Sequence, residues 1–189
     1  HAHTRSHSAA RRAFRPDSRF DCEQLDRRCT AGHRHRLGDS SAGLSILLDG
    51  KKEEYPMLAI RHQRPKPQID FGRILRESGA SSLNDVSDGL SREINEIALA
   101  SRVTIELEKE RIPLSDELCR WGQDCGKEPF HFAINGGEDY ELLFTVPIGD
   151  HEKIDKMENI RQIGYITKES LGAFLIARDG NEFELKAQG

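Results

Sequence analysis

Apolar residues recur along the chain with two spacings, one typical of helices and one typical of strands. Leu90, Ile94 and Ile97 fall on one face of a helix that we expect to end near Ser101. Alternation over residues 103–107 predicts a strand. By the same criteria we predict further helices over 44–48, 55–60, 69–78, 118–121 and 148–157, and further strands over 130–134, 140–146, 163–166, 173–177 and 182–185. Residues 83–86 are interpreted as a short strand or a turn.

These predicted elements do not alternate strictly. Long helices and strands in mixed order indicate an α+β fold with a mixed sheet packed with helices. Residues 178–181, Arg-Asp-Gly-Asn, predict a hairpin turn between the last two strands. Pro65 and Pro67 predict an extended connection between two helices.

Residues 1–36 differ in composition from the rest of the chain. Residues 1–37 contain nine Arg and four acidic residues, a balance of +5, whereas the remaining residues have a balance of −9. The first segment holds no Ile, Val or Met, so it has little apolar surface to offset the entropy of ordering. We expect residues 1–36 to be a disordered or non-native leader, such as an out-of-frame translation, and residues 37–189 to form the domain. A basic nucleic-acid-binding tail is the alternative.

The cysteines and the apolar runs bear on location. The spacings of Cys22, Cys29, Cys119 and Cys125 fit no common zinc site, and we interpret these residues as free thiols in a reducing cytoplasm. No apolar run reaches the length that spans a bilayer, and the first residues have no secretory h-region, so we expect no membrane partner.

The first acidic turn (residues 85–89, Asp-Val-Ser-Asp-Gly) stands directly before the helix that begins at Leu90. Asp85 and Asp88 are hard oxygen ligands that can bracket Mg²⁺, and the amide end of a helix favours phosphate. The alternative is a plain helix cap by Ser87 or Asp88. A calcium loop of the EF-hand type is excluded, because its glycine and apolar positions do not match.

The second acidic turn (residues 136–142, Gly-Gly-Glu-Asp-Tyr-Glu-Leu) follows about fifty residues later. Paired glycines allow a sharp bend before a strand, and Glu138 and Asp139 then stand where carboxylates can face a ligand. A solvated hairpin turn is the alternative. We interpret His62, His131 and His151 as structural, and the sequence contains neither a P-loop nor a Rossmann fingerprint.

Taken together, the two turns resemble the C-terminal half of thiamine-monophosphate kinase. The wider superfamily includes aminoimidazole ribonucleotide synthetase, selenophosphate synthetase and a hydrogenase maturation factor. The likeness covers roughly residues 37–189. It also includes, in order, Gly-Asp-Ser-Ser-Ala-Gly-Leu (38–44), Arg-His-Gln-Arg-Pro-Lys-Pro (61–67), Ile-Pro-Leu-Ser (112–115) and Ile-Gly-Tyr-Ile-Thr (163–167).

The resemblance implies ATP-dependent phosphorylation of thiamine monophosphate to thiamine diphosphate, with Mg²⁺ neutralising the phosphates. Asp85 and Asp88 would bind Mg²⁺, and Ser87 would contact an ATP phosphate. Glu138 would contact thiamine monophosphate, helped by Asp139. No residue is named as a catalytic acid or base, because this chemistry rests on positioning and electrostatics.

The sequence departs from the family at both ends. Residues 1–36 do not resemble the family's N-terminal domain, which carries further metal ligands and forms a homodimer, and the chain ends where an aromatic-x-His-Phe segment is expected. We therefore expect a fragment that folds but turns over poorly alone. The alternatives are another member of the superfamily, a non-catalytic nucleotide- or thiamine-phosphate-binding or assembly module, and, as the weakest, a nucleic-acid binder using the basic segment.

Overall fold

A seven-stranded mixed sheet forms the centre of the computed structural model, which describes residues 27–32, 36–150, 157, 160–167 and 172–186. The strands are β1 (Arg27–Gly32), β2 (Ser82–Asp85), β3 (Thr104–Glu108), β4 (Leu142–Pro147), β5 (Ile160–Thr167), β6 (Gly172–Ile176) and β7 (Glu182–Glu184). Their order in the sheet is β2-β4-β1-β5-β3-β6-β7, and every neighbouring pair is antiparallel except β3 with β6.

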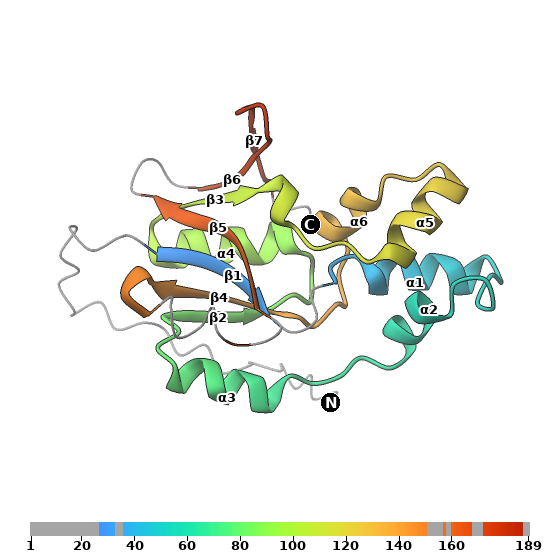
Figure 1. Cartoon of the computed structure of the whole chain (residues 1–189), viewed down its shortest axis with the longest axis horizontal. Coiled ribbons are helices and arrows are strands. Elements are labelled where there is room, and N and C mark those ends of the chain that lie inside the picture. Colours follow the sequence, from blue (N-terminus) through green and yellow to red (C-terminus); the bar gives the residue numbers. More distant parts are fainter. Residues whose placement is uncertain (1–26, 33–35, 151–156, 158–159, 168–171, 187–189) are drawn as a thin grey trace, which may run out of the picture.

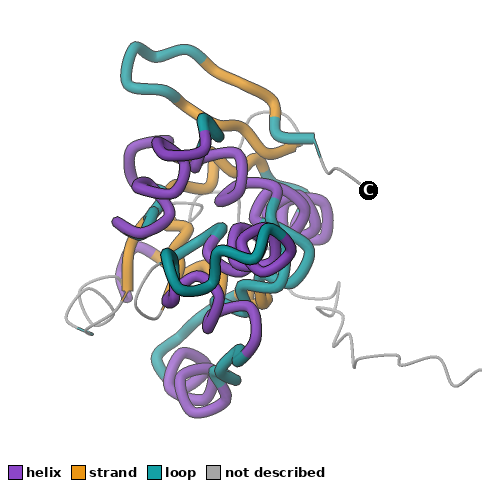
Figure 2. Tube along the Cα trace, turned by 90° about the vertical axis from the view of Figure 1, so that its right-hand side faces the viewer, coloured by secondary structure: helices purple, strands orange, loops and turns teal. Residues whose placement is uncertain are grey.

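Six α-helices surround this sheet in the described part of the chain. They are α1 (Asp39–Leu48), α2 (Pro56–Gln63), α3 (Ile69–Glu77), α4 (Leu90–Ser101), α5 (Asp116–Cys125) and α6 (Pro129–Asn135), with short 3-10 turns at Lys109–Arg111 and Ile148–Asp150. Helices α1, α2, α5 and α6 gather at one end of the sheet (Figure 1). Viewed from that end, they stand in front of the strands, and the β6–β7 hairpin projects beyond them (Figure 2). The predicted α+β class with a mixed sheet is confirmed.

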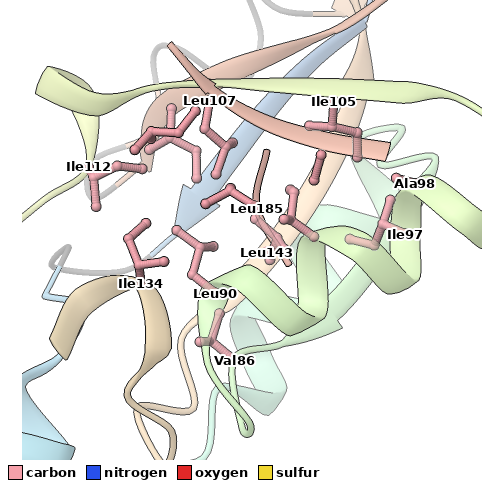
Figure 3. Close-up of a cluster of buried hydrophobic side chains, with 14 of the residues drawn as sticks. Val86, Leu90, Ile97, Ala98, Ile105, Leu107, Ile112, Ile134, Leu143 and Leu185 are labelled. Atoms are coloured by element: carbon pink, nitrogen blue, oxygen red, sulfur yellow. The ribbon is translucent and has the colours of Figure 1, made fainter. Parts of the chain in front are cut away.

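The largest apolar cluster lies between α4 and the sheet (Figure 3). Leu90, Ile94 and Ala98 present the buried face of α4, as the spacing of apolar residues predicts. Leu107 and Leu143, from β3 and β4, meet them from the sheet. At roughly 25 cal/mol per Å² of buried apolar surface, burial of each such side chain contributes about 1.5–3 kcal/mol. This cluster fixes the position of the N-terminus of α4, where the first acidic turn ends.

Two smaller clusters attach the remaining helices. Ile46, Leu58 and Trp121 are buried between α1, α2 and α5. The Trp121 ring meets Phe132 of α6 edge to face, with ring centroids 4.9 Å apart. A third cluster packs Leu75 of α3 against β4. The helical end, formed by α1, α2, α5 and α6, therefore has an apolar cluster of its own, and Ala133 and Ile134 of α6 also join the cluster between α4 and the sheet.

The expectation for residues 1–36 needs correction at Arg27–Gly32. These six residues form β1, which pairs with β4 on one side and β5 on the other, in the interior of the sheet. Backbone hydrogen bonding does not depend on the aliphatic side chains that the segment lacks, so poor composition did not exclude a strand. Residues 1–26 and 33–35 lie outside the described residues.

The strand predicted over 130–134 is wrong, because these residues belong to helix α6. Phe130, Phe132 and Ile134 alternate as in a strand, but Pro129 at the first helical position and the Glu128 side chain, which accepts from the Phe130 N–H at 3.3 Å, favour a helix start. Packing of Phe132 on the helical end then decides the conformation.

Two other expectations differ in detail. The N-cap of α4 is Gly89, and its cap carries no side-chain hydrogen bond, so neither Ser87 nor Asp88 caps this helix directly. Of the helix predicted over 148–157, residues 148–150 form a 3-10 turn and residues 151–156 lie outside the described residues. Within the described residues, no helix is both long and apolar enough to cross a bilayer.

Candidate functional site at the two acidic turns

The two acidic turns lie side by side because the pairing of β2 with β4 continues beyond the strands. The Val86 N–H donates to the Glu141 carbonyl at 2.8 Å, and the Tyr140 N–H donates to the Val86 carbonyl at 2.9 Å. The Glu138 N–H then donates to the Ser87 carbonyl at 2.8 Å. Segments fifty residues apart thus share one short ladder of backbone hydrogen bonds, and the predicted convergence of the two turns holds for their backbones.

Two glycines permit this close approach. A Cβ on Gly137 would lie 2.5 Å from the Ser87 carbonyl oxygen, a distance that real Cβ atoms do not show. Gly89 has a φ of +104°, and a Cβ there would lie 3.0 Å from the Asn135 carbonyl group. Any larger residue at position 137 would therefore separate the turns.

The second acidic turn contains two non-glycine residues in the left-handed region, Glu138 with φ 67° and Tyr140 with φ 53°. Each such residue costs on the order of 1–3 kcal/mol unless its surroundings impose the conformation. The hydrogen bonds from both amides to the first acidic turn supply that constraint. Backbone strain of this kind concentrates at binding and catalytic sites.

The strained turn presents Glu138 to solvent. The Tyr140 hydroxyl donates to the Glu138 carboxylate at 3.1 Å, and this hydrogen bond is the main cause that raises the pKa of Tyr140. Beside them lies a cavity of about 330 Å³, lined by Pro65, Lys66, Pro67, Gln68, Asp85, Tyr140 and Leu142. The predicted extended connection between α2 and α3 therefore forms one wall of a hollow next to both acidic turns.

The carboxylates predicted to bind Mg²⁺ stand at the surface of the first acidic turn. Asp85 and Asp88 are exposed and Ser87 is half-buried. Asp88 lies 3.5 Å from the guanidinium of Arg92, one helical turn away, in an exposed ion pair. Among the described residues, no group of three or more His, Cys, Asp or Glu side chains is arranged to hold a metal ion.

The carboxylates of Asp85 and Asp88 suit Mg²⁺ better than a metal ion whose ligands all come from the protein. Mg²⁺ retains several waters and is commonly bound by one or two carboxylates together with substrate phosphates. Two exposed aspartates beside the N-terminus of α4 meet that description. The residues present therefore fit the metal that the resemblance implies.

Glu93 of α4 is a site residue that the sequence reasoning missed. Glu93 is buried, with 4% of its surface exposed. Its carboxylate accepts hydrogen bonds from the Asn84 side-chain amide, from the Asp88 N–H at 3.2 Å and from the Ser87 hydroxyl at 3.4 Å. Burial raises the pKa of Glu93. The available signal was its position among Leu90, Ile94 and the other apolar residues on the buried face of α4, an unusual place for an acid.

Asp139 stands differently from its neighbour Glu138. Its carboxylate accepts from the N–H groups of Gly38 and Ser40, at 2.6 and 3.0 Å, and so caps the first turn of α1. Burial raises the pKa of Asp139 to about 7, and the nearby charge of Asp39 adds to the effect. The predicted contribution of Asp139 to substrate binding remains a prediction.

Asp139 belongs to the inner acid cluster (Asp39, Asp139 and Glu141, with Arg61), which lies behind the exposed carboxylates. The Arg61 guanidinium donates to Glu141 at 2.9 Å, and the Ser115 hydroxyl donates to Asp39 at 2.6 Å. Burial raises the pKa of Glu141 to about 8 and also raises that of Asp39.

The inner acid cluster draws on three of the motifs in which the resemblance was found: residues 38–44, 61–67 and the second acidic turn. His62 also contributes there, because its Nδ1 shares a hydrogen bond of 3.1 Å with the Ser40 hydroxyl. His131 contacts Asn135 in α6, and His151 lies outside the described residues.

Residues 33–176 match the model of the family described as AIR synthase related protein, C-terminal domain. The chain belongs to this family. It is 40% identical to the thiamine-monophosphate kinase of Aquifex aeolicus over 153 residues, which are 79% of this chain and 47% of that protein. It is 35% identical to the Bacillus subtilis thiamine-monophosphate kinase over 164 residues, which are 81% of this chain and 49% of that protein.

A solved structure of AaThiL complexed with AMPPCP and TMP superposes with a TM-score of 0.73 at 37% identity, covering 86% of this chain and 50% of that one. The chain thus spans about half the length of the relatives it matches. The resemblance to thiamine-monophosphate kinase drawn from the two turns is confirmed.

Proposed function

We propose that this chain forms the C-terminal half of a thiamine-monophosphate kinase, an ATP-dependent phosphotransferase that converts ATP and thiamine monophosphate to ADP and thiamine diphosphate. The observation that supports the proposal is the backbone pairing of the two acidic turns, on which Asp85, Asp88 and Glu138 are exposed. The relatives at 35–40% identity and the complex of AaThiL with an ATP analogue and TMP support the choice of substrates.

In this proposal each exposed side chain of the two turns has one task. Asp85 and Asp88 bind Mg²⁺, which neutralises phosphate charge when present, and Ser87 contacts a phosphate of ATP. Glu138 contacts thiamine monophosphate. Asp139 fixes the position of the neighbouring Glu138, because its carboxylate accepts hydrogen bonds from the N–H groups of Gly38 and Ser40 at the start of α1.

The reaction asks little acid–base chemistry of the protein. The bond from the γ-phosphorus to the β,γ-bridging oxygen of ATP breaks, and a new bond forms to an oxygen of the substrate phosphate. That oxygen carries no proton that must be removed, so the task of the site is to align two polyanions. A surface that is itself acidic cannot do this without cations, which is consistent with the exposed aspartates.

Location and assembly extend the same proposal. Cys119 and Cys125 are free thiols, consistent with a cytoplasmic enzyme. We propose a homodimer for the full-length protein and expect neither a membrane nor a nucleic-acid partner. The acidic balance of the residues after position 37 argues against nucleic acid.

Equilibrium binding tests the proposal directly. Isothermal titration of the purified chain with AMPPCP or thiamine monophosphate is expected to give binding that requires Mg²⁺. Asp85→Asn is expected to weaken it at least tenfold, whereas Asp70→Asn, an exposed aspartate of α3, is expected to leave it unchanged. Absence of Mg²⁺-dependent binding of both ligands at millimolar concentration would overturn the proposal.

The second candidate is a non-catalytic binding module that keeps the pocket without the chemistry. It is supported by the cavity of about 330 Å³ beside the two acidic turns, which binding alone would require. The same samples separate the two. Formation of thiamine diphosphate from ATP indicates the kinase, and Mg²⁺-dependent binding without product indicates the module.

A further inference from the structure

Glu93 is a buried acid whose contacts all lead to the segment that carries the first acidic turn. Each of its three donors belongs to residues 84–88: the side chain of Asn84, the hydroxyl of Ser87 and the backbone N–H of Asp88. The side-chain amide lies on one carboxylate oxygen, and the other two donors lie on the second. Glu93 itself is 4% exposed, so it cannot meet a ligand on the surface.

Only a carboxylate matches this set of donors. An ionised carboxylate accepts at both oxygens, whereas the amide of a glutamine accepts at one atom and donates at the other. A glutamine at position 93 would turn an N–H toward either Asn84 or the Ser87–Asp88 pair. At least one donor would then lack an acceptor in a buried place, which costs about 1–3 kcal/mol for each such group.

The hydrogen bonds to Glu93 hold the part of the first acidic turn that no other described element contacts through side-chain hydrogen bonds at the helix cap. Its backbone pairs with the second acidic turn through Val86 and Ser87, but the N-cap of α4 has no side-chain hydrogen bond. Glu93 therefore holds the inner side of the turn, while Asp85 and Asp88 stand on its outer side. Groups that orient metal ligands from behind in this way commonly change metal affinity by 10–100-fold when removed.

We propose that Glu93 is a positioning residue for the magnesium and phosphate site. It holds Asn84, Ser87 and Asp88 in the geometry that binding requires without touching the ligand. This inference deepens the proposed function and rests on it. It concerns the Mg²⁺ concentration that binding needs, and not the identity of the substrate.

The test compares Glu93→Gln with Glu96→Gln, a matched control on the same helix. Both changes remove one negative charge, but Glu96 is half exposed and forms an ion pair with Arg92 at 3.6 Å. AMPPCP binding is titrated against Mg²⁺ for each variant. We expect Glu93→Gln to raise the half-saturating Mg²⁺ concentration 10–100-fold. The control is expected to change it less than about twofold, as for a screened surface charge.

Circular dichroism and thermal unfolding establish that each variant is folded. A merely structural Glu93 would lower the melting temperature while the folded protein kept the wild-type Mg²⁺ requirement, and that result overturns the inference. If Glu93→Gln does not fold, Asn84→Ala carries the test, because it removes one donor and leaves the acid in place. A folded Asn84→Ala variant with the wild-type Mg²⁺ requirement then overturns the inference.

Failure of the inference and failure of the proposed function give different results. Wild-type protein that binds AMPPCP with a Mg²⁺ requirement supports the function, whatever Glu93→Gln does. Wild-type protein that shows no such requirement overturns the proposed function, and the role of Glu93 with it.

Discussion

Acidic residues occupy two neighbouring regions of this molecule under opposite physical conditions. Asp85, Asp88 and Glu138 stand on the outer side of the two acidic turns, in contact with solvent. The inner acid cluster lies directly behind them, where burial raises the pKa of Asp139 to about 7 and that of Glu141 to about 8. Adjacent residues of one motif, Glu138 and Asp139, belong to different regions.

The contrast between Glu138 and Asp139 shows that not every carboxylate of an acidic motif need bind a ligand. An outer carboxylate keeps its hydration and can exchange water for a cation at little cost to folding. An inner carboxylate has lost that hydration and is stabilised by Arg61 or by the amides of α1. Outer acids should therefore control binding, and inner acids should control stability and its pH dependence.

Removing the cation of the inner acid cluster should have the largest effect. Arg61→Met leaves Glu141, 2% exposed, without its partner at 2.9 Å. Above the pKa of about 8, Glu141 is ionised, so this variant would leave an uncompensated buried charge, and we expect the free energy of unfolding to fall by about 3 kcal/mol. Urea denaturation at pH 9 measures it. Arg64→Met, at the exposed end of the same helix, should change it by less than about 0.5 kcal/mol. Equal effects of the two variants would remove the distinction between inner and outer regions.

Separating the two turns should have the next largest effect. Gly137→Ala places a Cβ against the Ser87 carbonyl oxygen, and overpacking of this kind costs about 1–3 kcal/mol. Because the ladder between the turns would be disturbed, Mg²⁺-dependent AMPPCP binding should weaken as well. Gly149→Ala is the control, since a Cβ there meets nothing within 4 Å. Unfolding curves and titration calorimetry on both variants measure the two effects, and a Gly137→Ala variant with wild-type binding would contradict the pairing.

The inner acid cluster also sets a pH dependence with a definite sign. The pKa of Glu141 rises from 4.5 to about 8 and that of Asp139 from 3.8 to about 7, chiefly through burial. A raised pKa means that the folded protein holds the proton more tightly than the unfolded chain does. The stability contributed is present below about pH 4 and is lost as the pH rises through 7 and 8.

Between pH 5 and 8 the free energy of unfolding should therefore fall, on the order of 1 kcal/mol or more. Glu141→Gln should flatten the upper part of this slope, because the amide does not titrate. Its N–H group would also occupy the place of Glu141 Oε2, for which the described residues supply no hydrogen-bond partner. Glu182→Gln, an exposed change in β7, should leave the slope as in the wild type. Denaturation series across this pH range measure it, and a slope of opposite sign would refute the assignment of raised pKa values.

The sequence predicted helices and strands correctly where the spacing of apolar residues matches their burial. Helix α4 matches the predicted span because Leu90, Ile94 and Ile97 are buried as their spacing requires. The strand prediction over α6 was wrong because the alternation of Phe130 with Phe132 fits a strand, whereas Pro129 and the packing of Phe132 favour the helix. Strand β1 was missed because its pairing partners, and not its own composition, place it in the sheet.

The outer residues of the candidate site could be predicted from sequence, whereas the inner ones could not. The two acidic turns, which combine carboxylates with glycines, identify Asp85, Asp88 and Glu138 as candidates. The role of Asp139 depends on amides about 100 residues away, and that of Glu141 on an arginine 80 residues away. Such contacts appear only when the chain is folded, because no local window contains both partners.

Substitution of the outer acids should have the smallest effect on stability. It is also the strictest test of the difference between the outer acids and the inner acid cluster. Glu138→Gln and Asp88→Asn remove exposed charges, of which the Asp88–Arg92 pair, 3.5 Å apart, is worth at most about 1 kcal/mol. Unfolding free energies should stay within about 0.5 kcal/mol of the wild type at pH 7. Ligand binding should nevertheless divide between them: Asp88→Asn raises the Mg²⁺ requirement for AMPPCP, and Glu138→Gln weakens thiamine monophosphate while leaving AMPPCP unchanged. Loss of stability without loss of binding in either variant would place that acid with the inner cluster, because its charge would then be serving the fold.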